Sequence, residues 1–205
     1  MTIHVKICGV TTPEQALACA EAGASAIGVN FISSSPRCVD VVTARAIARA
    51  LGSRALLVGV VANLSVDQMC ELRLAADLGC LQLSGDEAPE SLLPLLPHAY
   101  KALRIALPSD VARAESFGGD HILVDAKVEG SLGGTGKTFD WRLVVGLAQR
   151  RKLTLAGGLS PENVASAVRA VRPFAVDVAS GVESGTPGTK DMARVRAFIA
   201  AARSA

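Results

Sequence analysis

The segments Leu-Ala-Gly-Gly-Leu-Ser-Pro-Glu-Asn (Leu155–Asn163) and Ala-Val-Asp-Val-Ala-Ser-Gly-Val-Glu (Ala175–Glu183) decide the predicted fold. Each is a short apolar run that stops at small residues, and the first leads directly into a helix start. Small residues let backbone N–H groups approach a ligand closely, and a helix N-terminus adds partial positive charge. Two such turns in succession predict one phosphate held by two neighbouring loops.

The same alternation of strand, turn and helix extends over the whole chain, with a period of about 25 residues. Continuously apolar strands between amphipathic helices are typical of parallel strands that are buried on both faces. Expected strands cover residues 3–8, 26–31, 55–61, 79–83, 100–105, 121–125, 153–156 and 174–178, and expected helices cover 13–22, 43–51, 66–76, 89–96, 141–150, 161–171 and 192–202. Eight units that close the sheet predict an α/β protein, a single-domain (β/α)8 TIM barrel over residues 1–205.

The main alternative is an open doubly wound sheet. A dinucleotide-binding sheet of this kind carries GxGxxG after its first strand, whereas this chain has Cys-Gly-Val-Thr-Thr-Pro at residues 8–13. The barrel is therefore favoured, and it places the two small-residue turns after strands seven and eight, where barrels commonly bind phosphate. Polar residues near the ends of the strands then converge on one mouth: Cys8, Asn30, Arg37, Asn63, Ser84, Asp125 and Asp177.

Composition narrows the class of function. Half of the 205 residues are apolar, 3% are aromatic, and the net charge of +2 arises from scattered Lys and Arg. No basic run interleaved with aromatic residues suggests a nucleic-acid partner. No apolar stretch reaches the roughly 18 residues of a membrane span, and the N-terminus lacks the layout of a signal peptide. We therefore expect a cytoplasmic protein without a membrane partner.

The five cysteines are odd in number and form no CxxC pair, which argues against a disulfide framework or a zinc site. Free thiols in a reducing compartment fit this pattern. Cys19, Cys70 and Cys80 are expected in the core, and Cys38 is expected to be structural. A lone cysteine after an apolar strand, as at Cys8, is usually a small core residue as well.

Eight segments of the chain, taken in order, resemble the phosphoribosylanthranilate isomerase family of tryptophan biosynthesis. They are Val-Lys-Ile-Cys-Gly-Val-Thr (5–11), Ser-Pro-Arg (35–37), Gln-Leu-Ser-Gly-Asp-Glu (82–87), Leu-Val-Asp (123–125), Gly-Gly-Thr-Gly-Lys-Thr-Phe-Asp-Trp (133–141), Ala-Gly-Gly-Leu-Ser-Pro-Glu-Asn-Val (156–164), Val-Asp-Val-Ala-Ser-Gly-Val-Glu (176–183) and Lys-Asp (190–191). Each segment alone is weakly specific, but the ordered set covers the chain from end to end. The resemblance implies a cofactor-free Amadori rearrangement of N-(5-phosphoribosyl)anthranilate to 1-(2-carboxyphenylamino)-1-deoxyribulose 5-phosphate.

This rearrangement needs one acid to protonate the ring oxygen and one base to remove the proton from C2. By resemblance, Asp125 is the acid and Cys8 is the base. At pH 7 a free Asp is protonated only about one part in a thousand, and a free Cys is only about 3% thiolate. Burial and an anionic substrate favour protonated Asp125 but oppose a Cys8 thiolate. Cys8 therefore needs nearby donors or a cation, and Lys6 or a helix N-terminus is a candidate.

The resemblance also implies the residues that bind the substrate. The Arg37 guanidinium would bind the anthranilate carboxylate with two parallel hydrogen bonds. Asp177 would contact the sugar or position the phosphate loop, although it could merely order its strand. The phosphate would be held by small residues of the two turns, Gly157, Gly158, Ser180 and Gly181.

The chain departs from the family pattern at Ser84, Asn30 and Val61, which replace a histidine, an apolar residue and an aromatic residue. All three are expected on the anthranilate side of the mouth, so the reaction class is more secure than the substrate. The alternatives are a diverged isomerase or lyase of another phosphorylated sugar, and a non-catalytic phosphate-binding barrel. In each case the partner is a small phosphorylated molecule, and the protein is expected to be a monomer or a homodimer.

Overall fold

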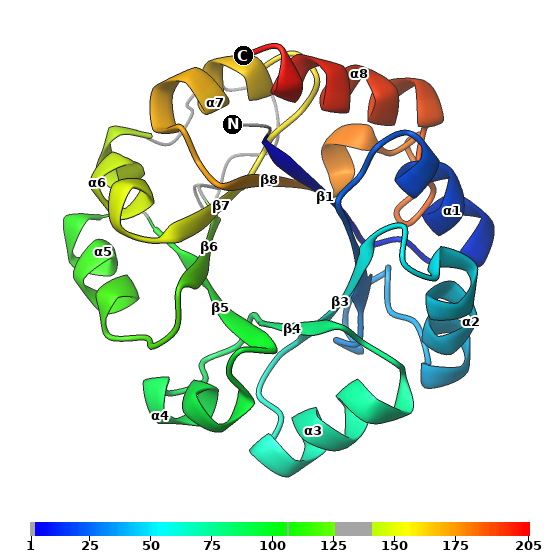
Figure 1. Cartoon of the computed structure of the whole chain (residues 1–205), viewed down its shortest axis with the longest axis horizontal. Helices are drawn as coiled ribbons and strands as arrows, with labels where there is room; N and C mark the ends of the chain where they lie inside the picture. Colours follow the sequence, from blue (N-terminus) through cyan, green and yellow to red (C-terminus); the bar gives the residue numbers. More distant parts are fainter. Residues whose placement is uncertain (1–2, 106, 126–140) are drawn as a thin grey trace.

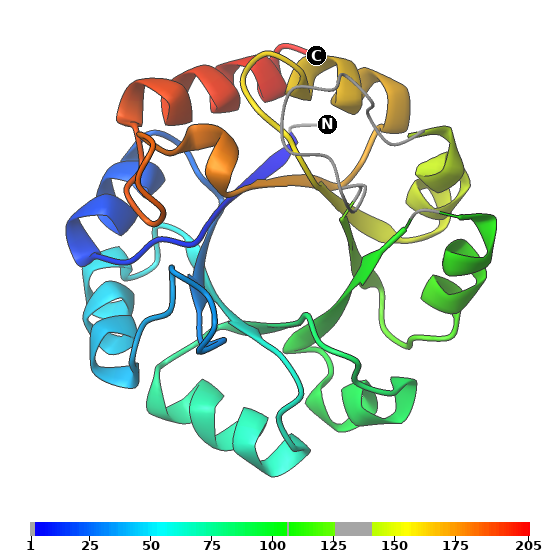
Figure 2. The same cartoon turned by 180° about the vertical axis from the view of Figure 1, so that it is seen from behind.

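The computed structural model describes residues 3–105, 107–125 and 141–205, and within them it confirms the predicted barrel. Eight parallel strands close on themselves in chain order, with the first strand paired to the eighth. Figures 1 and 2 show the two ends of this barrel and the helices that surround it. The strands are β1 (His4–Cys8), β2 (Ala26–Asn30), β3 (Leu56–Val61), β4 (Cys80–Leu83), β5 (Ala99–Arg104), β6 (His121–Asp125), β7 (Lys152–Ala156) and β8 (Ala175–Val178).

Half of the described helices begin after a residue whose side chain caps them. Thr12 accepts a hydrogen bond from the Gln15 N–H at 3.3 Å, and Ser65 and Gln68 form a reciprocal capping box. The helices are α1 (Pro13–Glu21), α2 (Val41–Leu51), α3 (Val66–Ala75), α4 (Pro89–Leu92), α5 (Pro108–Glu115), α6 (Arg142–Arg150), α7 (Val164–Val171) and α8 (Met192–Arg203), with the 3₁₀ turns η1 (Leu93–Leu95) and η2 (Ser180–Val182).

Helix α7 begins three residues later than the sequence predicts, at Val164 instead of residue 161. Asn163 causes the delay, because its φ of −120° is outside the helical region and its side chain folds back onto the preceding turn. The Asn163 amide donates to the Gly158 carbonyl at 3.0 Å and accepts from the Ser160 N–H at 2.9 Å. The segment that follows β7 is therefore a fixed turn before it is a helix.

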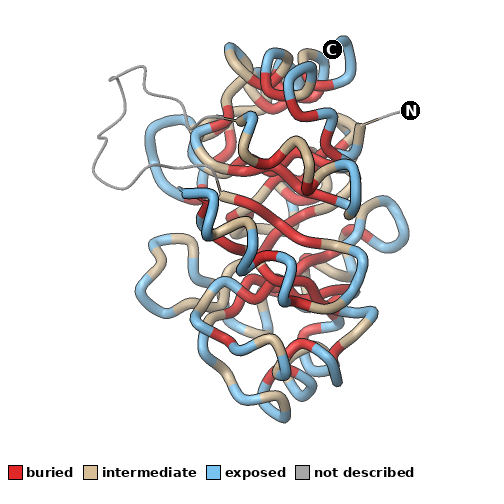
Figure 3. The backbone as a smooth tube through the Cα atoms, turned by 90° about the vertical axis from the view of Figure 1, so that its left-hand side faces the viewer, coloured by how far each residue is buried: buried red, intermediate tan, exposed pale blue. Residues whose placement is uncertain are grey.

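Apolar side chains form two cores, one on each side of the sheet. The larger core lies between the strands and the helices, and Figure 3 shows this buried layer beneath exposed outer helix faces. The smaller core lies on the opposite faces of the strands, inside the barrel, and comprises Val58, Cys80, Tyr100, Leu123 and Ala156. The barrel interior is therefore packed with side chains and is not an open channel.

Tilted and edge-on ring pairs lie at the end of the barrel at which the strands begin. The His4 and His121 rings lie 4.6 and 5.9 Å from the Phe174 ring, and Tyr100 lies 4.2 Å from His121. The His121 imidazole also shares a hydrogen bond of 2.7 Å with the Thr154 hydroxyl. Burial lowers the pKa of His121 to about 4, so this imidazole is neutral at pH 7.

Two of the three cysteines predicted in the core are buried, and Cys38, predicted to be structural, is exposed. Cys19 and Cys80 are buried as expected, but the prediction for Cys70 is wrong, because Cys70 lies exposed on α3. An apolar residue on a helix surface is common and carries no information about the core. Over the residues that the structure describes, none of the helices is both long enough and apolar enough to span a membrane.

Candidate active site

Cys8 ends β1, and the same face of the strand carries Lys6, a buried lysine inside the barrel. The Lys6 ammonium donates to the Asp177 carboxylate at 2.9 Å and to the Gln82 amide oxygen at 2.8 Å. Lys6 and Asp177 are register partners on neighbouring strands, so the barrel itself brings this ion pair together. The side chains of the pair are only 5% and 7% exposed.

Gln82 extends this network across the barrel. Its amide oxygen also accepts from the Tyr100 hydroxyl at 3.1 Å, and its NH₂ group donates to the Ser84 hydroxyl at 3.2 Å. Ser84, which replaces a family histidine, is therefore linked to Lys6 through Gln82. The sequence did not reveal Gln82, although it lies within one of the resembling segments and points to the same side of β4 as Ser84.

Gly28 on β2 leaves room for the thiol and the ammonium to lie side by side. A Cβ atom at Gly28 would approach the Cys8 Sγ to 2.8 Å and the Lys6 Cε to 3.0 Å. Burial raises the pKa of the Cys8 thiol, the Lys6 ammonium opposes the rise, Asp177 adds to it, and Lys190 opposes it more weakly. Burial and Asp177 thus favour the neutral thiol, whereas Lys6 and Lys190 favour the thiolate.

A second ion cluster lies beside Cys8. The Arg37 guanidinium donates from Nε and Nη2 to the two Glu183 oxygens at 2.7 and 2.6 Å, and Lys190 donates to Glu183 at 3.0 Å. Although burial acts in the opposite direction, the hydrogen bonds from Arg37, Gly188 and Lys190 lower the pKa of Glu183 to about 2. Arg37 is a predicted site residue, whereas Glu183 and Lys190, which both lie in resembling segments, had no predicted role.

Arg37 reaches this position by crossing over the residue that follows Cys8. Gly9 has a φ of +73°, and a Cβ atom there would lie 2.4 Å from the Arg37 Cδ. Any other residue would be strained and would displace the arginine side chain. The glycine after the cysteine therefore places the predicted carboxylate-binding arginine next to the predicted base.

The two small-residue turns lie against each other, as the sequence predicts. Gly157 and Gly158 follow β7 with φ values of +93° and +64°, a conformation that favours glycine. Gly181 follows β8, and a Cβ atom there would lie 2.0 Å from the Leu159 carbonyl oxygen. Only glycine permits this approach, so the turns after β7 and β8 form one continuous surface at the mouth.

Asp125 ends β6, on the opposite side of the barrel opening from β1 (Figure 1). Its register partners are Arg104 on β5 and Ala156 on β7, so the carboxylate stands between a cation and the first phosphate turn. The side chain is partly exposed. The resembling segment at 133–141 that follows Asp125 lies outside the described residues, except for Trp141.

Asp177 has an acceptor that the network does not use. Its Oδ2 atom receives the Lys6 ammonium, whereas its Oδ1 atom is buried without a hydrogen-bond donor among the residues that the structure describes. A buried carboxylate oxygen without a donor costs free energy, so such atoms commonly mark places where a ligand binds.

The three departures from the family pattern have different surroundings. The Asn30 side chain accepts from the Ile32 N–H at 2.7 Å and so orders its own loop at the mouth. Ser84 is exposed at the mouth. The prediction that Val61 lines the mouth is wrong: it is buried in the outer core, because it points from β3 toward the helices.

Another buried lysine, Lys101, lies on the outer face of β5 and fixes, directly and through Glu87, the loops that follow β3 and β4 by hydrogen bonds. It donates to the carbonyls of Leu83 and Gly85 at 3.2 and 2.5 Å and to Glu87 at 2.7 Å. Glu87 in turn accepts from the N–H groups of Asn63 and Gly85 at 2.8 and 3.2 Å. Asn63, predicted at the mouth, is thereby held in the link between these loops.

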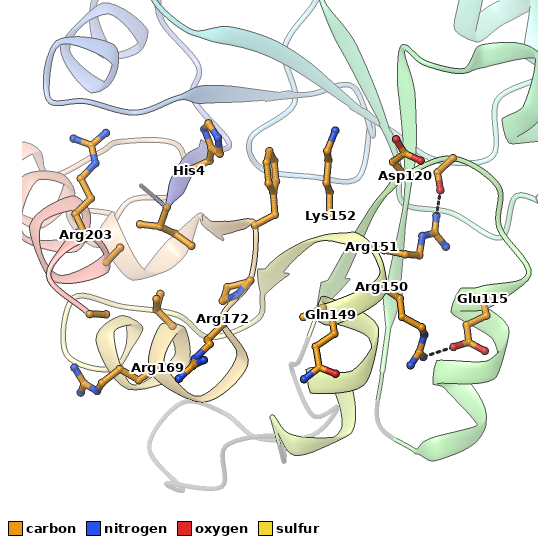
Figure 4. Close-up of a pocket in the computed structure, with 18 of the residues that line it drawn as sticks. His4, Glu115, Asp120, Gln149, Arg150, Arg151, Lys152, Arg169, Arg172 and Arg203 are labelled. Carbon is orange, nitrogen blue, oxygen red and sulfur yellow. Dashed lines mark hydrogen bonds and ion pairs between the residues drawn. The ribbon is translucent and has the colours of Figure 1, made fainter. Parts of the chain in front are cut away.

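The other end of the barrel holds a basic cavity of about 1370 Å³, and Figure 4 shows its charged lining. None of the predicted catalytic or binding residues lines it. Several of its cations are already engaged, because Arg150 pairs with Glu115 and Arg151 donates to the carbonyls of Ala114, Gly118 and Gly119. Among the described residues, no cluster of His, Cys, Asp and Glu could hold a metal ion.

A (β/α)8 barrel with a half-buried thiol, a carboxylate across the mouth and two glycine turns defines a class, the barrel enzymes that act on small phosphorylated substrates. The family model described as N-(5'phosphoribosyl)anthranilate (PRA) isomerase matches residues 5–201. The chain belongs to this family of isomerases.

Individual relatives agree with this assignment. N-(5'-phosphoribosyl)anthranilate isomerase of Myxococcus xanthus is 46% identical, covering 100% of this chain and 98% of the relative. The Pseudomonas aeruginosa enzyme is 48% identical, covering 98% and 96%. The crystal structure of phosphoribosyl anthranilate isomerase from Thermotoga maritima matches with a TM-score of 0.90 at 39% identity, covering 99% and 100%.

A further crystal structure shows the same enzyme with a bound ligand. It is phosphoribosyl anthranilate isomerase in complex with reduced 1-(o-carboxyphenylamino)-1-deoxyribulose 5-phosphate, and it matches with a TM-score of 0.86 at 36% identity, covering 99% and 100%. The predicted family and fold are therefore confirmed.

Proposed function

We propose that this chain isomerises N-(5'-phosphoribosyl)anthranilate in tryptophan biosynthesis, with Cys8 as the base and Asp125 as the acid. Family membership over residues 5–201 supports the activity. One observation carries the residue roles. Cys8 and Asp125 end strands on opposite sides of one barrel mouth, so a sugar bound between them would meet a proton donor on one side and an acceptor on the other.

The proton transfers follow from this arrangement. Protonated Asp125 gives its proton to the ring oxygen while the C1–O bond breaks, which leaves an open-chain iminium ion at C1. The Cys8 thiolate then removes the proton from C2, and the electrons of the C–H bond form the C1–C2 double bond of an enolamine. Tautomerisation of the enolamine yields the ketone product. Each step moves only protons and electron pairs within the substrate and these two side chains.

The substrate's two ends would be bound by different parts of the mouth. Glu183 occupies Nε and Nη2 of Arg37, so the anthranilate carboxylate would be met mainly by the remaining Nη1 side of the guanidinium. Asp177 Oδ1 would accept a hydrogen bond from a sugar hydroxyl. The phosphate would lie on backbone N–H groups of the paired turns, at Gly157, Gly158, Ser180 and Gly181.

The cellular setting follows from the activity. A biosynthetic enzyme of this kind would act in the cytoplasm on a small phosphoribosyl substrate. We infer a monomer or a homodimer, which light scattering of the purified chain over a range of concentrations would distinguish.

Rescue of a tryptophan auxotroph that lacks this isomerase tests the proposal. We expect wild type to restore growth and Cys8→Ser and Asp125→Asn to fail, because each removes a group that contributes about 10²–10⁴-fold. Cys38→Ser and Asp120→Asn are matched controls at other positions of the chain and should restore growth. Failure of folded wild-type protein to restore growth, or to turn over the substrate in vitro, would exclude the activity.

A further inference from the structure

Lys6 is the charged side chain most closely associated with Cys8. It precedes Cys8 by two residues on the same face of β1, and it is 4% exposed. The Lys6 Cε and the Cys8 Sγ both pack against Gly28 on β2, where a Cβ atom would collide with each of them. An ammonium has three N–H donors, and Asp177 and Gln82 receive two of them. The positive charge of the Lys6 ammonium lowers the pKa of the Cys8 thiol against the rise that burial causes.

We propose that Lys6 is a positioning residue that supports Cys8 as the base, by sharing its ammonium between the thiol and Asp177. This inference rests on the proposed function and adds a role for a buried lysine to which that function assigns none. A buried cysteine without a cation would stay a thiol at pH 7, and a thiol cannot remove a proton from carbon.

The other charges that face Cys8 act on it less strongly than Lys6 does. They come from Lys190 after η2, Arg37 after β2 and Asp177 on β8, and the neutral Tyr100 hydroxyl on β5 also faces the thiol. Arg37 and Lys190 share the Glu183 carboxylate. Among the described residues, Lys6 forms its ion pair with Asp177, whose second oxygen has no donor there.

The unused Asp177 oxygen suggests how substrate would affect the thiol. A sugar hydroxyl that donates to Oδ1 would draw carboxylate charge away from Lys6, because each added donor reduces the pull of the carboxylate on its other partner. The ammonium would then favour the Cys8 thiolate more strongly in the complex than in the free enzyme. Base activation would thus be coupled to occupation of the sugar site.

A simpler role for Lys6 is to neutralise a buried aspartate, and thiol alkylation separates the two. In a Cys38→Ser/Cys70→Ser background, which removes the exposed thiols, the rate of Cys8 alkylation by iodoacetamide is followed against pH by peptide mass spectrometry. We expect Lys6→Met to raise the midpoint by at least about one pH unit and to slow alkylation at pH 8 about tenfold. Lys6→Arg should restore much of the difference.

Lys190→Met is the matched control and should shift the midpoint less, because Lys190 acts on the Cys8 thiol more weakly than Lys6 does. The same variants tested on substrate should show the rising limb of kcat/KM moving upward in Lys6→Met, with kcat lowered more than KM is changed. A folded Lys6→Met protein with the wild-type alkylation midpoint would overturn the proposal.

Lys6→Met leaves a buried carboxylate without its partner and could fail to fold. Lys6→Met/Asp177→Asn removes both charges and keeps the shape of the pair. Because Lys6 acts on the thiol more strongly than Asp177 does, the double variant should still raise the midpoint, and an unchanged or lowered midpoint would contradict the inference. If the wild-type protein turns over the substrate and the double variant has an unchanged or lowered midpoint, the role of Lys6 is wrong and the proposed function stands. If the wild-type protein does not turn over the substrate, the proposed function is wrong.

Discussion

Two of the buried lysine–carboxylate pairs among the described residues are of nearly equal length but differ in how completely their hydrogen-bonding groups are used. Lys101 and Glu87 lie 2.7 Å apart on the outer side of the sheet, and backbone groups of two loops occupy their remaining donors and acceptors. Lys6 and Asp177 lie 2.9 Å apart inside the barrel, beside a thiol, and one carboxylate oxygen has no donor among the described residues.

The comparison shows that burial and charge alone do not identify a functional group. A buried pair whose hydrogen-bonding groups are all used can only hold structure in place, since no acceptor or donor remains for a ligand. A buried pair with an unused acceptor carries a cost that a ligand can remove. Substitution of the Lys101–Glu87 pair should therefore lower the stability of the fold, whereas substitution of the Lys6–Asp177 pair should mainly change the catalytic rate.

The largest expected effect is on stability, at the satisfied pair. Lys101→Met leaves Glu87 buried without its cation and releases two loop carbonyls, so we expect the free energy of unfolding to fall by about 3–5 kcal/mol. Urea denaturation followed by circular dichroism measures the change. The kcat/KM of the fraction that remains folded should change less than tenfold, because Lys101 contacts no predicted substrate-binding residue.

Lys152→Met is the control. It removes an exposed lysine from the start of β7 and should change stability by about 0.5 kcal/mol or less. If Lys101→Met were as stable as wild type, or lost its chemistry while keeping its stability, the distinction between the two pairs would be wrong.

How much of this the sequence could predict depends on the range of the interactions. The strand pattern and the turn glycines are local, and they predicted the barrel and the position of the two turns correctly. Val61 was misplaced because its side of the strand depends on the register of β3 within the closed sheet. Glu183 and Lys190 received no role because their partner, Arg37, is distant in sequence and only the fold brings them together.

Arg37 gives a smaller and more specific effect, because its pair with Glu183 is intermediate between the two buried pairs. The Arg37 side chain is 21% exposed, and Glu183 uses only Nε and Nη2. We expect Arg37→Ala to raise KM about 10- to 100-fold through loss of a charged hydrogen bond worth about 1.5–3 kcal/mol, with a smaller change in kcat.

Arg37→Lys sharpens this test. A lysine keeps the charge beside Glu183 but lacks the planar fork, so it should preserve stability and recover only part of the affinity. Steady-state kinetics on both variants measures the split, and Arg169→Ala, at the opposite end of the barrel, is the control. An unchanged KM in Arg37→Ala would remove Arg37 from the substrate site.

The smallest expected effect is on the stability of the fold in acid, through the Glu183 carboxylate. Although burial acts to raise it, the pKa of Glu183 is lowered to about 2 in the folded chain by its hydrogen bonds from Arg37, Gly188 and Lys190, against an ordinary value of 4.5 for a glutamate. A carboxyl group with a depressed pKa stabilises the fold above its unfolded value, and this contribution is lost as the pH falls from about 4.5 toward 2, with a slope of at most about 1.4 kcal/mol per pH unit for one proton. Urea midpoints measured between pH 5 and 3 should therefore fall less steeply in Glu183→Gln than in wild type. Equal slopes would mean that Glu183 is not held ionised by Arg37 and Lys190, and that this third pair resembles an ordinary surface ion pair.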